Sequence, residues 1–182
     1  MINNKLIDPK SIVVIGASND VSKPGGKVLK NLLESNFQGN VYAINPKESE
    51  VQGVKCYKSV EELPQVDCAI LAIAAKYCPA TVETLAKKKG TGGYIILSAG
   101  FSEENEIGAQ LEKSIVDSIN SVGGSLIGPN CTGFLNTNYC GAFDAPIPSL
   151  SNQGVDFITG SGATAVFIKE YGMTNGLSFN SV

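Results

Sequence analysis

The sequence predicts an α/β fold in which helices cover both faces of a parallel sheet, followed by the opening of a second α/β unit. Near-continuous apolar runs alternate with amphipathic segments, a pattern typical of parallel strands buried on both faces. Glycine turns follow these runs. They therefore fall at the carboxyl ends of the strands, where such sheets form their ligand crevice.

The first unit is expected over residues 1–130, with five strands and four helices in alternation. The strands are expected at residues 11–15, 41–44, 67–73, 94–98 and 125–127, where apolar residues dominate. The helices are expected at 27–36, in a short turn that begins at Ser59 and is ended by Pro64, at 79–89 and at 104–121.

Local signals support these helices. Ser59 and Glu62 match a capping box, and Pro79 stands where a first helical residue is favoured. In the last helix an apolar stripe is expected from four residues at helical spacing, Ile107, Leu111, Ile115 and Ile119.

The periodicity stops over residues 131–152, which we interpret as a connection between two domains. It restarts over 153–182, with a strand at 154–159, a helix at 163–171 and a strand at 176–182. One such βαβ unit of about 30 residues cannot form a domain alone. We therefore expect the chain to be a fragment that stops early in its second domain.

Composition limits the functional classes. The chain has 182 residues, 43% of them hydrophobic, and a formal net charge of −3. This charge gives no general attraction to nucleic acid or to an anionic membrane. No apolar run reaches the roughly 18 residues that span a bilayer, and the N-terminus lacks the core of a signal peptide. We expect a cytoplasmic protein with no nucleic-acid or membrane partner.

Cysteine and histidine usage narrows the chemistry further. Five cysteines without a Cys-x-x-Cys pair do not resemble a disulfide framework or a zinc site. The chain contains no histidine. It therefore holds no Ser-His-Asp triad and no base for Cys131, and no catalytic residue is predicted.

The ends of the first two strands indicate a phosphorylated nucleotide. Gly16, Ala17 and Ser18 form a turn whose amides, with the following helix start, suit phosphate oxygens. The Gly-x-Gly-x-x-Gly fingerprint of NAD sites is absent, and Asn45-Pro46-Lys47 stands where NAD proteins carry an acid. Lys47 is therefore predicted to contact a phosphate on the ribose. A turn without a ligand and an ordinary surface lysine remain the alternatives.

Small residues follow the next strands, where a long flexible ligand would run against the backbone or the turns would simply pack closely. These candidates are Ala74, Ala75, Ser98, Ala99 and Gly100, and Asn130 after the fifth strand is a further candidate for cofactor binding. In the second unit, Ser161, Gly162 and Ala163 repeat the arrangement of strand, turn and helix. Ser161 acting only as a helix N-cap is an equal alternative.

Five motifs in order resemble one family: Ile15-Gly16-Ala17-Ser18, the strand ending in Asn45-Pro46-Lys47, Ser98 to Glu103, Ile127 to Cys131, and Gly160 to Ala163. They are similar to the NDP-forming acyl-CoA synthetases, the ADP-forming acetyl-CoA synthetases in particular, and more distantly to the succinyl-CoA synthetase α subunit. The resemblance implies a Rossmann-like coenzyme A (CoA) binding domain followed by the start of a flavodoxin-like ligase domain. Many members have Gln where this chain has Gly160.

The resemblance also implies a reaction: acyl-CoA, ADP and phosphate are converted to an acid, CoA and ATP, through an acyl phosphate and a phosphohistidine. The turn at Gly16–Ser18, with Asn45 and Lys47, would hold the CoA nucleotide. The small turns at Ala74-Ala75 and Ser98–Gly100 would line the path of the pantetheine arm, and Ser161–Ala163 would cradle phosphate. ADP, ATP and Mg²⁺ are expected only on missing ligase and ATP-grasp domains or subunits, the complete protein being an oligomer.

Two other functions stay open. A non-catalytic CoA-binding regulatory module, for example one attached to an acetyltransferase, would share the same first domain. An NAD(P) dehydrogenase is disfavoured by the missing fingerprint and by the missing acid after the second strand.

Overall fold

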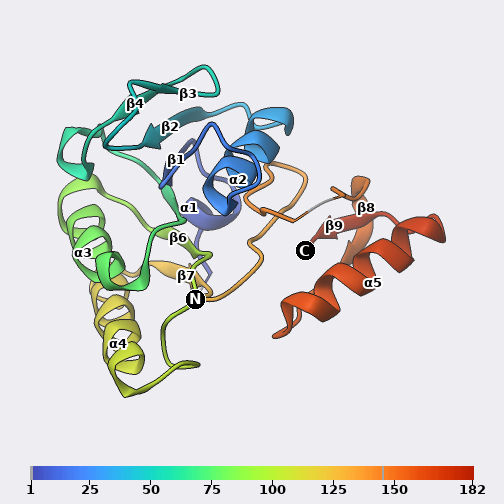
Figure 1. Ribbon diagram of the computed structural model, residues 1–182. Coiled ribbons are helices and arrows are strands. Elements are labelled where there is room, and N and C mark those ends of the chain that lie inside the picture. The colour runs from blue at the N-terminus through green and yellow to red at the C-terminus, as the bar shows by residue number, and fades with distance from the viewer. Residues whose placement is uncertain (1, 145) are drawn as a thin grey trace.

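The computed structural model describes residues 2–144 and 146–182, and it contains a seven-stranded sheet in the order β3-β4-β2-β1-β5-β6-β7 (Figure 1). All neighbouring strands pair in parallel except β3 with β4. The strands are β1 (Ser11–Ile15), β2 (Asn40–Ile44), β3 (Glu50–Val51), β4 (Val54–Tyr57), β5 (Cys68–Leu71), β6 (Gly93–Ile96) and β7 (Ser125–Ile127). The predicted Rossmann-like fold is confirmed, and the strand order reverses between β1 and β5.

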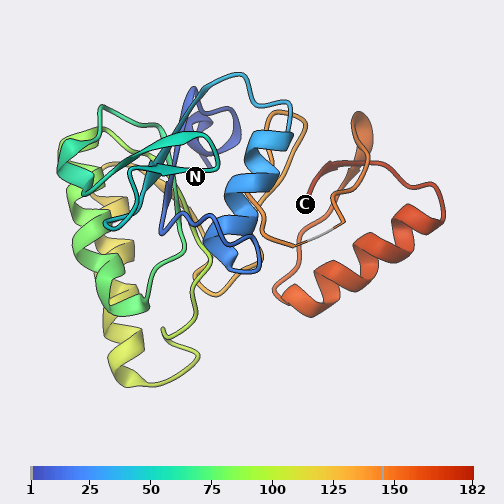
Figure 2. The same ribbon diagram turned by 45° about the horizontal axis from the view of Figure 1, so that its top comes forward.

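The helices lie on both faces of this sheet (Figures 1 and 2). They are α1 (Asn4–Ile7), α2 (Pro24–Glu34), α3 (Cys78–Lys89) and α4 (Glu106–Asn120), with 3₁₀ turns η1 (Val60–Glu62) and η2 (Ala75–Tyr77). Alternate residues of β1 pack on the two faces of the sheet, because successive side chains of a strand point to opposite faces. Ile12 and Val14 pack in the cluster that holds the apolar side of α2, whereas Val13 and Ile15 pack with α3 and α4.

The sequence prediction missed the β3–β4 hairpin, which occupies the polar passage around Gly53. Its strands are two and four residues long, too short for an alternating pattern to be visible. Its tip is formed by Gln52 and Gly53, both with positive φ (50° and 81°).

Two details of the predicted helices were wrong. The residues after Ser59 form a single 3₁₀ turn, and Ser59 makes no side-chain cap hydrogen bond. Ile107 is 71% exposed, because α4 begins at Glu106 with Asn105 as its cap and places Ile107 in the first turn on the outer side. The buried stripe of this helix therefore starts at Leu111, which is partly buried.

The described residues between 131 and 149, with residue 145 left out, contain no helix and no named strand, yet they pack closely. Leu135, Tyr139 and Cys140 are buried, and the Tyr139 hydroxyl donates a hydrogen bond to the carbonyl of Leu6 (2.6 Å). Leu135 exchanges two backbone hydrogen bonds with Val182, both 2.9 Å long. This segment therefore joins the sheet to the end of the chain.

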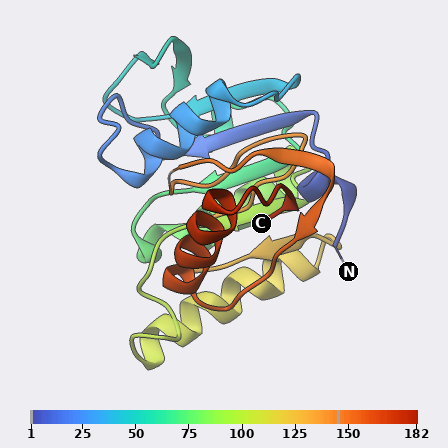
Figure 3. The ribbon, with the colours of Figure 1, turned by 90° about the vertical axis from the view of Figure 1, so that its right-hand side faces the viewer.

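The second unit consists of β8 (Leu150–Asp156), α5 (Gly162–Thr174) and β9 (Phe179–Ser181), with β8 and β9 paired in parallel. It lies beyond α2, on the face of the sheet away from α3 and α4 (Figures 1 and 3). The strand β8 begins four residues before the predicted start. The prediction missed these first residues because their burial does not alternate and all of them are at least partly exposed.

Candidate functional site: a crevice at the carboxyl ends of the strands

The turn after β1 is built on glycine, because the backbone of neighbouring elements comes very close to it. A Cβ atom on Gly16, which has φ of 85°, would lie 2.4 Å from the carbonyl oxygen of Ala72. A Cβ on Gly25, in the first turn of α2, would lie 2.0 Å from the carbonyl oxygen of Gly16. The start of α2 is thus pressed directly onto the turn, where the positive end of its dipole favours an anion.

The amides of this turn divide into two groups. The N–H groups of Gly16 and Ala17 both donate to the carbonyl of Ile44 at the end of β2 (3.1 and 3.2 Å). Among the described residues, the next two N–H groups, of Ser18 and Asn19, have no hydrogen-bond partner. Two adjacent free donors before a helix start form a cradle for phosphate oxygens.

The loop that leads into α2 is internally braced. The Asp20 carboxylate accepts from the N–H and hydroxyl of Ser22 (3.0 and 2.6 Å) and lies 3.6 Å from the Lys23 ammonium. The hydrogen bond from the Ser22 hydroxyl is the largest of the contacts that hold the pKa of Asp20 below its ordinary value. Lys23 is the N-cap of α2 and provides no side-chain acceptor, so the helix start is left open for an anion.

Asn45 connects the two strand ends. Its Nδ2 donates to the carbonyl of Ala17 (2.8 Å), and its Oδ1 accepts from the N–H groups of Lys47 and Glu48 (2.9 and 3.3 Å). The side-chain amide is therefore occupied by the protein, and Asn45 fixes the position of Lys47 relative to the glycine turn.

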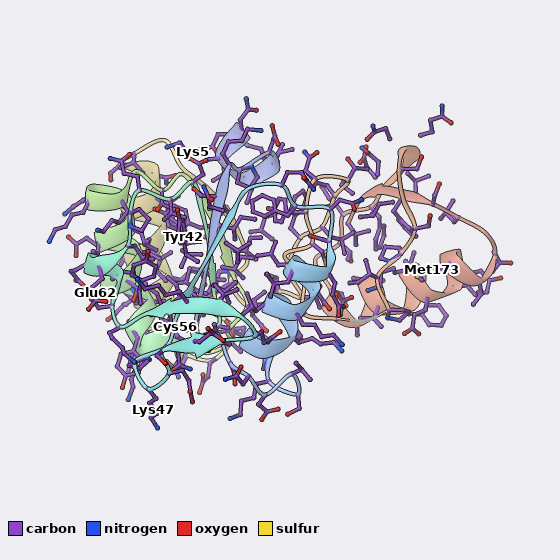
Figure 4. All side chains as sticks on the ribbon, turned by 90° about the horizontal axis from the view of Figure 1, so that it is seen from above. Lys5, Tyr42, Lys47, Cys56, Glu62 and Met173 are labelled. Atoms are coloured by element: carbon purple, nitrogen blue, oxygen red, sulfur yellow. The ribbon has the colours of Figure 1, made fainter. Side chains whose placement is uncertain are left out.

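Lys47 extends from the loop after β2 away from the ribbon (Figure 4). Its side chain is exposed. Among the described residues its ammonium makes no ion pair. Lys47 is therefore an unpaired cation at the end of β2, which Asn45 connects by a hydrogen bond to the turn after β1.

The predicted small turns meet at the same edge of the sheet. The Ser98 hydroxyl donates to the carbonyl of Ile73, next to Ala74, and the Asn130 N–H donates to the carbonyl of Ser98 (2.9 Å). A Cβ on Gly100, beside Ala99, would lie 3.2 Å from the Cβ of Ala75. The structure thus brings these six candidates together as one wall, in which all residues except Asn130 are small.

Glu103 organises this wall, a role that local periodicity could not indicate. Its two carboxylate oxygens accept from the N–H groups of Gly100 (2.7 Å) and Phe101 (3.2 Å). The bond from Gly100, as the largest cause, lowers the pKa of Glu103. The turn after β6 is thereby held in the conformation that gives Gly100 its φ of 105°.

The second glycine turn lies beside the segment that leaves β7. A Cβ on Gly162 would lie 3.0 Å from Cγ2 of Thr132, two residues after Asn130. Ser161 caps α5, since its Oγ accepts from the N–H of Thr164 (3.3 Å). The structure therefore shows the capping role of Ser161, and it places this turn, with Ala163, close to the crevice.

Cys131 does not have the environment of a nucleophile. Its thiol donates to the carbonyl of Ile96 (3.4 Å), and burial raises its pKa to about 11. Among the described residues, no group of His, Cys, Asp and Glu side chains could hold a metal ion. No described helix has the length and apolar character needed to cross a membrane.

Comparison with known proteins identifies the family. Residues 10–137 match the profile of a family described as CoA binding domain. Over 181 residues the chain is 39% identical to acetate–CoA ligase [ADP-forming] I of Archaeoglobus fulgidus, covering 98% of this chain and 26% of that protein. It is 44% identical over 159 residues to the α subunit of acetate–CoA ligase [ADP-forming] II of Pyrococcus furiosus, covering 86% of this chain and 34% of the subunit.

A solved structure agrees with these relatives. The dinucleotide-forming acetyl-coenzyme A synthetase 1 of Ca. Korarchaeum cryptofilum, in complex with phosphate and ADP, superposes with a TM-score of 0.88 at 31% identity. The match covers 98% of this chain and 38% of the synthetase, so the chain spans about a quarter to two fifths of such relatives. Because residues 10–137, more than half of the chain, match this family, the chain belongs to the CoA binding domain family.

Proposed function

We propose that this chain is the CoA-binding part of an NDP-forming acyl-CoA synthetase that acts on acetyl-CoA or a similar short acyl-CoA. In the complete enzyme, acyl-CoA, ADP and phosphate would be interconverted with the acid, CoA and ATP. One observation carries the proposal: two free amides and an uncapped helix start follow β1, at the point where the strand order reverses, and a free lysine follows the neighbouring β2.

The chemistry of this crevice suits CoA. The diphosphate would accept from the Ser18 and Asn19 amides at the start of α2, and the ribose phosphate would pair with Lys47. The pantetheine arm would run along the turns after β5, β6 and β7, where most of the candidate residues are small. Those turns are formed by Ala74, Ala75, Ser98, Ala99, Gly100 and Asn130.

The second turn, at Ser161, Gly162 and Ala163, would hold phosphate at the start of α5. The Ser161 hydroxyl already accepts from Thr164, so its remaining contribution would be the proton of its hydroxyl and the amides of the first helical turn. Its position beside Thr132 would keep this phosphate near the crevice.

Catalysis would need more than these 182 residues. The chain has no histidine, so a phosphohistidine would have to come from another domain or subunit. ADP or ATP with Mg²⁺ would bind there as well, and the complete assembly would be a cytoplasmic oligomer. Alone, the chain would bind CoA without turning it over.

The proposal is tested by calorimetric titration of the protein with CoA, NADP and NAD. We expect saturable binding of CoA and no response to NAD. Tight NAD binding without a CoA response would instead support a dehydrogenase. A regulatory module attached to an acetyltransferase would also bind CoA, and the coding sequence downstream of Val182 distinguishes it from a ligase.

A further inference from the structure

The tip of the β3–β4 hairpin reaches over the glycine loop that precedes α2. The Gln52 Nε2 donates to the carbonyl of Ser18 and to the carbonyl of Gly26, both at 2.8 Å. The backbone N–H of Gln52 donates to Oδ1 of Asn19 (2.9 Å). One residue of the hairpin therefore connects the beginning of the loop with the first turn of the helix.

These contacts determine where the free amides point. In a trans peptide the C=O of one residue and the N–H of the next lie in one plane and point in opposite directions. The Ser18 carbonyl faces Gln52, so the N–H of Asn19 must point away from the hairpin. In the same way Asn45 holds the Ala17 carbonyl (2.8 Å), and the N–H of Ser18 points away from Asn45.

The N–H groups of Ser18 and Asn19 therefore belong to the two peptide groups whose carbonyl oxygens accept from the side chains of Asn45 and Gln52. The hairpin tip adopts a left-handed backbone at Gln52, with φ of 50°, a conformation that non-glycine residues rarely take. The two-residue hairpin turn requires this conformation at both of its central residues, and three hydrogen bonds from Gln52 fix the tip against the loop and the start of α2.

We propose that Gln52 is a positioning residue of the CoA site, which orients the Asn19 N–H toward the diphosphate by holding the Ser18 carbonyl. The inference rests on the proposed function and adds to it a residue outside the five motifs that carry the resemblance. It implies that Gln52 supports binding of CoA and of dephospho-CoA alike, because both carry the diphosphate and only CoA carries the ribose phosphate.

The test replaces Gln52 by Met, which has a similar shape but no donor, and replaces the exposed Gln110 of α4 by Met as a matched control. Calorimetry measures the affinities for CoA, dephospho-CoA and pantetheine. We expect Gln52→Met to weaken CoA and dephospho-CoA by the same factor, about tenfold, which is the value of one or two oriented hydrogen bonds. Pantetheine binding and the control variant should not change.

A spectroscopic measurement follows the orientation directly. In ¹⁵N–¹H spectra of the unmodified protein, CoA should shift the Asn19 amide resonance, and in Gln52→Met this shift should be reduced. Unchanged CoA affinity in Gln52→Met, or an equal loss for pantetheine, would overturn the inference. So would an Asn19 amide that does not respond to CoA in the unmodified protein, even if the variant fails to fold. If the unmodified protein binds no CoA at all, the proposed function itself fails.

Discussion

The ion pair between Lys169 and Asp144 allows a quantitative prediction about how the second unit is held. Lys169 of α5 has no exposed side-chain surface, and its ammonium contacts the Asp144 carboxylate, whose side chain is 12% exposed. The backbone carbonyl of Asp144 in turn accepts from Nδ2 of Asn31 in α2 (3.1 Å). The pair therefore joins α5 to the segment that is bound to the first domain.

Replacing Asp144 by Ala would leave a buried ammonium without its counter-charge. Breaking a buried pair in this way costs about 3–5 kcal/mol. For a chain of this size, about 2–4 °C in Tm corresponds to 1 kcal/mol, so Tm should fall by roughly 6–20 °C. Replacing both partners by apolar residues, in Asp144→Leu with Lys169→Met, removes the unpaired charge and should restore most of the stability.

Urea unfolding of Asp144→Ala and of the double variant forms the assay, since the midpoint reports the change in free energy when the slope is constant. The exposed pair of Lys113 and Asp117 on α4, with side chains 75% and 63% exposed, is the control. Asp117→Ala should cost less than about 1 kcal/mol. The reasoning is refuted if Asp144→Ala is as mild as the control, or if the double variant is as unstable as Asp144→Ala.

Two further predictions concern the crevice. Lys47→Glu should weaken CoA at least about tenfold more than it weakens dephospho-CoA, because only CoA carries the ribose phosphate, and equal losses in calorimetry would contradict that contact. Glu103→Gln should change how the free energy of unfolding depends on pH in acid. The pKa of Glu103 is lowered in the folded state, so the ionised carboxylate stabilises the fold above the unfolded value of 4.5, and this stabilisation is lost as the pH falls below it. Urea midpoints measured from pH 3 to 6 should therefore fall less steeply with acid in the variant than in the unmodified protein, and parallel curves would show that the carboxylate does not stabilise the turn.

The sheet could be predicted from the sequence because its central strands are buried on both faces. All five residues of β1 and all four of β5 are buried, which produces the continuous apolar runs. The β3–β4 hairpin could not be predicted in this way. Its six strand residues alternate between exposed and buried over too short a length, and its position depends on the contacts of Gln52 with a loop more than twenty residues away.

The candidate site was predictable to a similar extent. Small residues after each strand indicated the turns, and the parallel topology guaranteed that these turns would meet at one edge. The hydrogen bonds that orient them were not visible, because a side-chain amide such as that of Asn45 gives no local indication of which carbonyl it will hold. The sequence therefore suggested Asn45 as a ligand, whereas its amide is engaged by Ala17, Lys47 and Glu48.

A crevice formed mainly by backbone explains why the recognisable motifs of this chain are small residues. Backbone amides offer the same hydrogen bonds whatever side chain they carry, provided that the chain can approach closely, and closeness is what Gly16 and Gly25 supply. Specificity for one nucleotide must then come from the few side chains at the rim. Among the motif residues of the nucleotide half, Lys47 is the cation at the end of β2, so discrimination between CoA and dephospho-CoA should depend on it, while affinity for the shared diphosphate should depend on what orients the turn.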